Sequence, residues 1–214
     1  DTRAVEPLLE ALTTFESSYA EDEIAIALGI IGDPIVVEPL ILELRKKENK
    51  GIVYALGEIG DVRAVEPLIS ELRKVFSPIN GYTYEVGKAL SKIKNQQYTI
   101  ELLIPLLKDK DVNMRNSIVR TLGYMKGSIV EASLNLALKD EEIFVRNTAA
   151  EILAKRKMKE PNATELLVND LKSKNLQVRY AAKVALCNLT NKDFGFNYRE
   201  WINWFKENGK STNR

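Results

Sequence analysis

The residue types that most often carry out chemistry in proteins are scarce in this chain of 214 residues. It contains no histidine and a single cysteine, Cys187. A lone cysteine cannot form an internal disulfide, and the lack of histidine removes both the commonest metal ligand and the commonest general base. Acid–base chemistry would therefore fall to Asp, Glu and Tyr. The sequence favours a non-catalytic protein: we expect no catalytic residue, no cofactor and no metal, and a small, half-buried structural position for Cys187.

The elements that position any site are organised by an internal repeat. Residues 27–41 read ALGIIGDPIVVEPLI and residues 55–69 read ALGEIGDVRAVEPLI, which agree at 11 of 15 positions after a shift of 28 residues. A third copy of the second half, DTRAVEPLL, opens the chain. Self-similarity at such a period is typical of stacked arrays, in which each unit buries its apolar face against its neighbours.

Apolar residues around six aligned leucines fall at helical intervals, which predicts the second helix of each repeat. These leucines are Leu28, Leu56, Leu90, Leu122, Leu153 and Leu186. Segments between them, such as 65–72 and 102–107, carry a similar stripe and supply the first helices. We therefore predict an all-α protein, a right-handed α-solenoid (superhelix) of about six helical hairpins plus a C-terminal capping helix. It forms one domain, 1–214, with repeats at 1–31, 32–59, 60–94, 95–126, 127–157 and 158–190 and a cap at 191–214.

The junctions between the repeats have the chemistry of a helix end followed by a helix start. Gly32-Asp33 and Gly60-Asp61 offer a glycine that can adopt positive φ and an aspartate that can cap the next helix. Pro34 suits the first helical position. Three prolines lie six residues after the aspartates and should bend or restart the first helices: Pro7, Pro39 and Pro67.

The tail after Asp193 breaks the repeat and concentrates aromatic residues. Trp201, Trp204 and Phe205 have helical spacing and could cover the last apolar face of the array. A ligand-binding aromatic cluster is the alternative. The N-terminus shows no equivalent cap and begins at a junction, so we expect at least one further helix upstream.

These motifs resemble HEAT-like repeats, in particular the short type first associated with phycobilisome (PBS) lyases. The resemblance rests on the LGxIGDxxAVEPL junctions and, later in the chain, on Met114-Arg115, Val145-Arg146 and Val178-Arg179. It implies that acidic residues four or six positions before each arginine pair with it along the stack. Asp109 and Asp111, then Asp140 and Glu142, fit this pattern, whereas the last copy has Ser173 and Asn175. Three early copies have other residues at the arginine position: Glu21, Asn49 and Thr83.

The resemblance also implies that the second helices line a concave groove, with the residues one, five and nine positions after the arginine pointing into it. Eight of these positions are our candidate partner-binding residues, because tyrosine and basic side chains are good interface anchors. They are Tyr54, Tyr84, Lys88, Lys92, Arg120, Tyr124, Lys155 and Tyr180. The other positions are Asp22, Ile26, Ile30, Lys50, Glu58, Asn116, Asn147, Glu151, Val184 and Asn188.

Three functional classes remain open. A non-catalytic scaffold that binds a protein or peptide in its groove needs only these anchors, and we favour it. Nucleic-acid binding or DNA repair is the second, because residues 80–214 carry 23 basic and 15 acidic side chains, whereas residues 1–79 carry 8 and 15. A bilin lyase or isomerase is the third, by resemblance. The His-Glu metal motifs of deoxyhypusine hydroxylase, another HEAT-like enzyme, are absent. We expect a cytoplasmic protein without a membrane span.

Overall fold

The computed structural model describes residues 2–14, 18–74, 81–157 and 163–208. Within these ranges the regular structure is α-helix with short 3₁₀ turns, and no strand occurs. The chain divides into two compact units, Asp1–Val130 and Glu131–Arg214, which we describe separately. None of the helices in the described ranges is both long and apolar enough to cross a membrane. The organisation as one domain, 1–214, stays a prediction.

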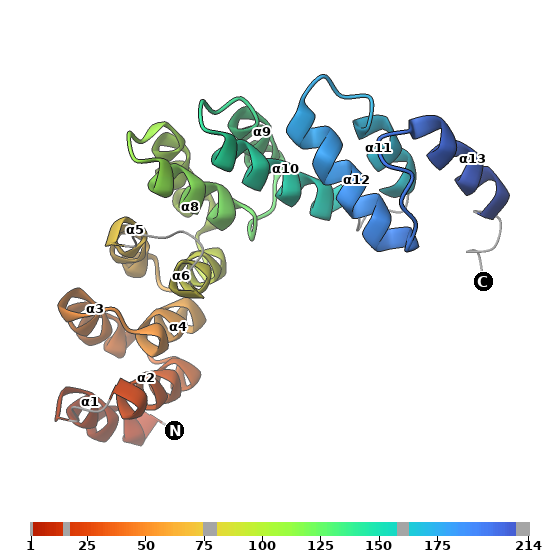
Figure 1. Ribbon diagram of the computed structural model, residues 1–214. Coiled ribbons are helices and arrows are strands. Elements are labelled where there is room, and N and C mark those ends of the chain that lie inside the picture. Colours follow the sequence, from red (N-terminus) through yellow and green to blue (C-terminus); the bar gives the residue numbers. More distant parts are fainter. Residues whose placement is uncertain (1, 15–17, 75–80, 158–162, 209–214) are drawn as a thin grey trace. The chain divides into compact units, whose positions relative to one another are not determined.

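The first unit is built from four successive helical pairs. The pairs are α1 (Val5–Thr14) with α2 (Ser18–Ile31), α3 (Val37–Lys46) with α4 (Lys50–Ile59), α5 (Val65–Lys74) with α6 (Gly81–Lys92), and α7 (Gln96–Leu103) with α8 (Val112–Leu122). Figure 1 shows α1, α3 and α5 in one row and α2, α4 and α6 in a second row. In the second row α2 packs on α4, α4 on α6 and α6 on α8. The second helices therefore form one continuous layer.

The second unit continues the helical pairs and ends in a single helix. Its elements are α9 (Ser128–Ala137), of which all but the first three residues lie in this unit, α10 (Ile143–Lys157), α11 (Ala163–Asp170), α12 (Leu176–Thr190) and α13 (Tyr198–Asn208). α10 and α11 pack on α12, and α13 packs on α11. Each expected repeat contains one pair within the described residues, and the expected cap contains α13. The all-α solenoid of helical hairpins is confirmed.

Packing explains the residues that recur after the aligned leucines. All six leucines are buried. The next residue is Gly29 in α2 and Gly57 in α4, and both lie against the neighbouring helix. A Cβ on Gly29 would lie 2.6 Å from Cα of Ala55, and one on Gly57 would lie 2.7 Å from Cα of Ala89. Such separations are too short for any side chain, so these glycines set the close spacing of α2, α4 and α6.

The repeat junctions have the predicted conformation. Gly32 and Gly60 adopt φ of 73° and 68°, a region that favours glycine. Asp33 and Asp61 then accept hydrogen bonds from backbone N–H groups two residues later, at 3.0 and 2.9 Å. Asp1, the corresponding residue of the first copy, lies outside the described residues.

The prolines after these aspartates restart the helices rather than bend them. A 3₁₀ turn, Pro34–Val36, precedes α3, and another, Val62–Ala64, precedes α5. Pro39 and Pro67 then fall in the first turn of the α-helix that follows. Proline is tolerated there because the first backbone N–H groups of a helix have no partner within the helix.

The arginines that open the later second helices share one bonding pattern. Nη1 of Arg115 donates to the carbonyl oxygens of Asp109 and Lys110, at 2.9 and 3.4 Å. Arg146 and Arg179 donate in the same way to the carbonyls six and five residues before them, at 2.7 to 3.2 Å. These bonds use backbone oxygens, so they do not require an acidic side chain. This explains why the arginine persists in the last copy, which lacks the acids.

The acidic residues before Arg115 also serve other partners. Asp111 caps α8 by accepting a hydrogen bond from Asn113 N at 2.9 Å. The carboxylate of Asp109 accepts a hydrogen bond from the backbone N–H of Asp111 and pairs with Arg73 of α5 at 2.8 Å, and these contacts lower its pKa. In two early copies the residue at the arginine position has a different role: Asn49 caps α4, and buried Glu21 pairs with Lys47 at 2.6 Å.

The predicted C-terminal cap is present. Trp201 is fully buried in a core formed by α10, α11 and α12, and its Nε1 donates to the Gly195 carbonyl at 3.1 Å. Phe194 and Phe205 contact its ring, with centroids 4.9 and 6.1 Å away. Cys187 packs half-buried against the same core, and burial raises the pKa of its thiol. The aromatic tail therefore covers the last repeat.

A buried tyrosine–carboxylate pair in the first unit predicts a loss of stability at alkaline pH. The hydroxyl of Tyr82 donates to Oε2 of Glu71 at 2.7 Å, and Lys74 pairs with Oε1 of Glu71 at 2.5 Å. Burial, and then the hydrogen bond to Glu71, raise the pKa of Tyr82 far above its usual value near 10. The folded state therefore retains the phenol proton that the unfolded state releases.

We expect the free energy of unfolding to be insensitive to this group below about pH 9 and to fall above about pH 10, by up to ~1.4 kcal/mol per pH unit. The Tyr82→Phe variant removes the titrating group, so its urea midpoint should decline less over the same range. Urea titrations followed by circular dichroism measure both. Parallel declines in the two proteins would contradict the assignment to Tyr82.

Candidate partner-binding faces

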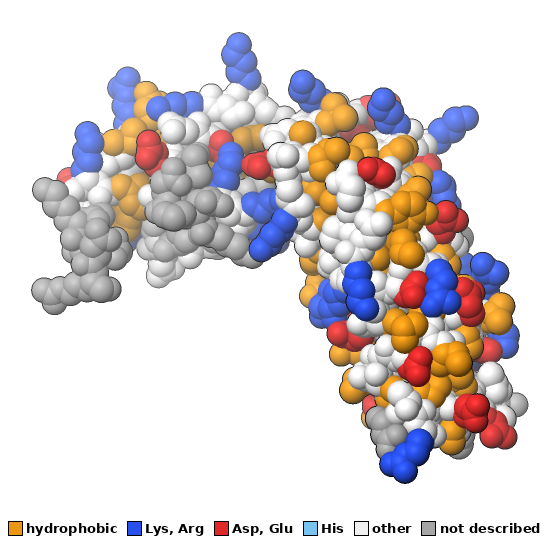
Figure 2. Space-filling view, turned by 180° about the vertical axis from the view of Figure 1, so that it is seen from behind, with side chains coloured by type: hydrophobic (Ala, Val, Ile, Leu, Met, Phe, Trp, Pro, Cys, Tyr) orange, Lys and Arg blue, Asp and Glu red, His pale blue; other side chains and the backbone are white. Residues whose placement is uncertain are grey.

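Six of the eight candidate residues lie on neighbouring second helices of the first unit. We call this set the unit 1 patch: Tyr54 on α4, Tyr84, Lys88 and Lys92 on α6, and Arg120 and Tyr124 on α8 or immediately after it. The other two, Lys155 on α10 and Tyr180 on α12, lie in the second unit. Figure 2 shows exposed hydrophobic side chains scattered among charges of both signs on the surface.

An exposed aromatic pair joins α6 to α8. The rings of Tyr84 and Tyr124 meet edge to face with centroids 5.5 Å apart, although 49% and 41% of these residues remain exposed. Lys88 Nζ lies 5.8 Å from the Tyr84 ring centroid. Burial, followed by the proximity of Tyr84, raises the pKa of Tyr124. Each ring therefore restrains the other while leaving a face free for contact.

A charged pair supports the third tyrosine of the patch. Lys92 forms an ion pair with Glu58 of α4, and this hydrogen bond lowers the pKa of Glu58. Lys92 Nζ also lies 5.1 Å from the Tyr54 ring centroid. One positive charge of the patch is thus neutralised within the protein, and it ties α6 to α4.

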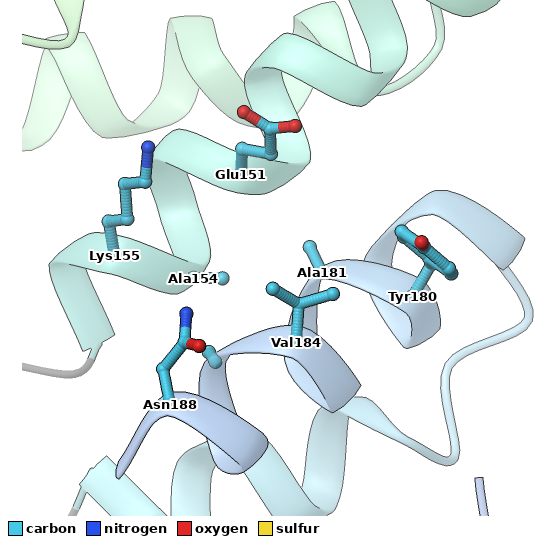
Figure 3. A pocket seen from close by; sticks show the side chains of 8 residues that line it. Glu151, Ala154, Lys155, Tyr180, Ala181, Val184 and Asn188 are labelled. Atoms are coloured by element: carbon cyan, nitrogen blue, oxygen red, sulfur yellow. The ribbon is translucent and has the colours of Figure 1, made fainter. Parts of the chain in front are cut away.

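In the second unit, Lys155 and Tyr180 border a groove of about 300 Å³ between α10 and α12. We call it the α10–α12 groove. Its lining residues are Glu151, Ala154, Lys155, Tyr180, Ala181, Val184, Ala185 and Asn188. In Figure 3 the side chains of Glu151 and Lys155 project to the same side of the helix pair as those of Tyr180 and Val184. Polar groups therefore surround a floor of alanine and valine.

The three alanines that line this groove were not among the positions singled out in the sequence. The groove exists because Ala154, Ala181 and Ala185 have side chains too small to fill the space between the helices. The sequence shows small residues on both second helices, but it does not show that they face one another. They would predict a groove only once the two helices were known to be neighbours.

Of the positions expected to face the groove, Asn116 does not, and Asp22 has a structural role. Asn116 is fully buried, because α8 is packed against α5, α6 and the 3₁₀ segment Ile104–Lys108, which bury most of its first half. Both polar atoms of its amide lack a hydrogen-bond partner among the described residues. Asp22 has a structural task, since its Oδ1 accepts a hydrogen bond from the Gly51 N–H at 3.0 Å. The one-five-nine rule is therefore wrong for Asn116.

The described residues contain no group of three or more His, Cys, Asp or Glu side chains arranged to hold a metal ion. The cations and tyrosines of the two faces can instead supply hydrogen bonds, charge pairing and aromatic contact area. These are the interactions that proteins use at protein–protein interfaces.

Comparisons of sequence identify the repeats. The HEAT repeats family matches residues 100–187, and the PBS lyase HEAT-like repeat family matches residues 50–74. Among curated proteins, none is similar enough in sequence to count as a match.

Several solved structures are similar at low identity. One is the complex of CpcE and CpcF of phycocyanin lyase from Nostoc sp. PCC7120, at 21% identity over 85% of this chain and 75% of that chain, with a TM-score of 0.48. An engineered protein matches at 21% identity over 87% of this chain and 96% of that chain, with a TM-score of 0.39. Human deoxyhypusine hydroxylase matches at 16% identity over 96% and 88%, with a TM-score of 0.34.

The two family matches fall in different parts of the chain, and both fall on helical pairs with buried leucines at the repeat positions. The helices, the glycine–aspartate junctions and the capped end all have the form that the motifs predict. The chain is a HEAT-like repeat protein.

Proposed function

We propose that this protein is a non-catalytic scaffold that binds a segment of a partner protein on the faces of its second helices. The observation that carries the proposal is the Tyr84–Tyr124 pair, which is exposed and yet held in a defined edge-to-face geometry. Large aromatic side chains that are ordered before binding lose little conformational entropy in a complex. Such residues commonly supply most of the binding free energy of an interface.

The surroundings of the pair support the same function. Lys88 and Arg120 flank the two rings on α6 and α8. In the second unit, the α10–α12 groove offers a small apolar floor with Lys155 and Tyr180 at its border. A repeated layer of helices with anchors at successive positions suits an extended segment, which can contact several repeats in turn.

Nucleic-acid binding is the competing function, and the charge of the first unit argues against it. Residues 1–130 carry 16 basic and 19 acidic side chains, so a duplex would meet a net negative unit. The PBS lyase HEAT-like match covers residues 50–74 only and describes a repeat type. The match therefore supports the repeat fold and gives no support to bilin chemistry.

Binding is tested by quantitative affinity capture with the wild-type protein and the Tyr84→Ala/Arg120→Ala/Tyr124→Ala variant. Removal of anchors worth at least about 2 kcal/mol together should weaken the capture of true partners by about thirtyfold or more. The control is Tyr19→Ala, which removes an exposed tyrosine of α2 (76% exposed) outside the patch. Circular dichroism should show both variants folded.

Unchanged capture by the triple variant would refute the role of the patch. A labelled DNA duplex is tested alongside. Salt-sensitive binding of that duplex, abolished by the same three substitutions, would favour the nucleic-acid function instead.

A further inference from the structure

The layer of second helices in the first unit changes in chemistry from α2 to α8. At α2 it presents Ile26 and Ile30, and Ile30 is 72% exposed. At α6 and α8 it presents Lys88 and Arg120 beside the tyrosine pair. A ligand that crosses the layer therefore meets an apolar surface at one end and a cationic surface at the other.

The basic side chains at the α6–α8 end differ in whether they form an ion pair within the protein. Lys92 is paired with Glu58. In contrast, neither Lys88 nor Arg120 has a carboxylate within ion-pair distance among the residues that the structure describes. The Nε of Arg120 is buried and lacks a hydrogen-bond partner there. A guanidinium that is partly desolvated and unpaired is the group that a carboxylate satisfies best.

We propose that this layer binds an extended acidic segment of another protein, an inference that rests on the function proposed above. Carboxylates of the segment pair with Lys88 and Arg120, its backbone crosses the rings of Tyr84 and Tyr124, and an apolar side chain contacts Ile26 and Ile30. The net negative charge of the first unit makes a short acidic stretch preferable to a long polyanion, which would also meet the acidic side chains of this unit.

The helix spacing fixes how far apart the two features of the segment lie. From α2 to α6 there are two helix-to-helix intervals, each about 8 to 10 Å. Gly29 and Gly57 hold these intervals near the lower limit. An extended chain advances about 3.3 Å per residue, so the apolar residue should lie roughly five or six positions from the acidic residue that pairs with Lys88 on α6. The acidic residue that pairs with Arg120 lies one interval farther, on α8, and should be roughly seven to nine positions from the apolar residue.

The test uses the purified full chain to select binders from a displayed library of random peptides of about 12 residues, which reach about 40 Å when extended. We expect several-fold enrichment of Asp and Glu, with an apolar residue roughly five or six positions from one acidic residue and roughly seven to nine from another. The affinity of enriched peptides should fall at least about tenfold with Lys88→Ala/Arg120→Ala, since two charge pairs are lost. The control, Lys110→Ala, removes an exposed lysine in the turn before α8 and should not change binding.

A variant with reversed charges distinguishes ion pairing with the peptide from apolar packing against it. The Lys88→Glu/Arg120→Glu variant should reject the acidic peptides and bind versions with Lys in place of Asp and Glu. The selected peptides could instead show no enrichment of Asp and Glu, and yet fail to bind the Tyr84→Ala/Tyr124→Ala variant. That result would overturn the proposal of an acidic segment but would leave the proposed scaffold function intact. The absence of any peptide that depends on this layer would overturn both.

Discussion

Replacement of Trp201 by alanine is expected to lower the stability of the second unit by about 3 to 5 kcal/mol, which is typical of a fully buried aromatic residue. The indole joins α13 to the core of α10, α11 and α12 and donates its N–H to Gly195. In the structure α13 covers the apolar face of the last helical pair, so that face depends on this helix. We expect α11 and α12 to lose protection from hydrogen exchange together with α13.

The matched control for this prediction is Phe196→Ala. Phe196 is an aromatic residue of the same tail that is 47% exposed, and its removal should change stability by no more than about 0.5 kcal/mol. Urea unfolding followed by circular dichroism gives the stability, and hydrogen exchange locates the loss. Equal midpoints for Trp201→Ala and Phe196→Ala would show that α13 is not a structural cap.

Substitution of Gly57 by alanine is expected to destabilise the first unit, although alanine is the better helix former. The propensity gain is about 1 kcal/mol. Against it, the new Cβ would lie 2.7 Å from Cα and 2.9 Å from Cβ of Ala89, so the backbones of α4 and α6 must separate. Such overpacking usually costs about 1 to 3 kcal/mol, and because the obstructing atoms include backbone we expect a net loss.

Gly87→Ala provides the contrast, because it is also a helical glycine at a helix–helix contact. The nearest atoms to its added Cβ are Oγ1 of Thr121 at 3.0 Å and Cε2 of Tyr124 at 3.3 Å, and the nearest backbone atom is Cα of Thr121 at 3.4 Å, so the overlap is smaller than at Gly57. We expect this variant to lose less stability in thermal unfolding than Gly57→Ala does. If Gly57→Ala proves as stable as wild type, α4 and α6 do not pack as closely as the structure indicates.

The fold could be predicted from the sequence because its signals are local and repeated. The glycine–aspartate junctions and the aligned leucines each recur, and every copy supports the others. The reason for the small residue after the leucine was not visible, since Gly57 is explained by Ala89 in the next repeat. Contacts between repeats depend on the register of neighbouring helices, which a periodic pattern does not supply.

The candidate faces were predictable only in part, for the same reason. Helical spacing places Tyr84 and Tyr124 on the same layer, but their edge-to-face contact depends on how α6 crosses α8. The rule that selected Tyr124 also selected Asn116, which is buried because α5, α6 and the 3₁₀ segment Ile104–Lys108 pack against α8. The hydrogen bonds from the arginines to backbone carbonyl oxygens could not be predicted either, because they depend on the conformation of the turn before each helix.

Fluorine NMR of the protein labelled with 3-fluorotyrosine tests the central claim most directly, because the chain contains eight tyrosines with distinct environments. Tyr→Phe variants assign the signals, which are then followed while a captured partner or selected peptide is added. We predict that the signals of Tyr84 and Tyr124 shift, while those of buried Tyr82 and of Tyr98 on α7 stay in place. Shifts confined to Tyr98, with Tyr84 and Tyr124 unchanged at saturation, would contradict binding on the second-helix layer.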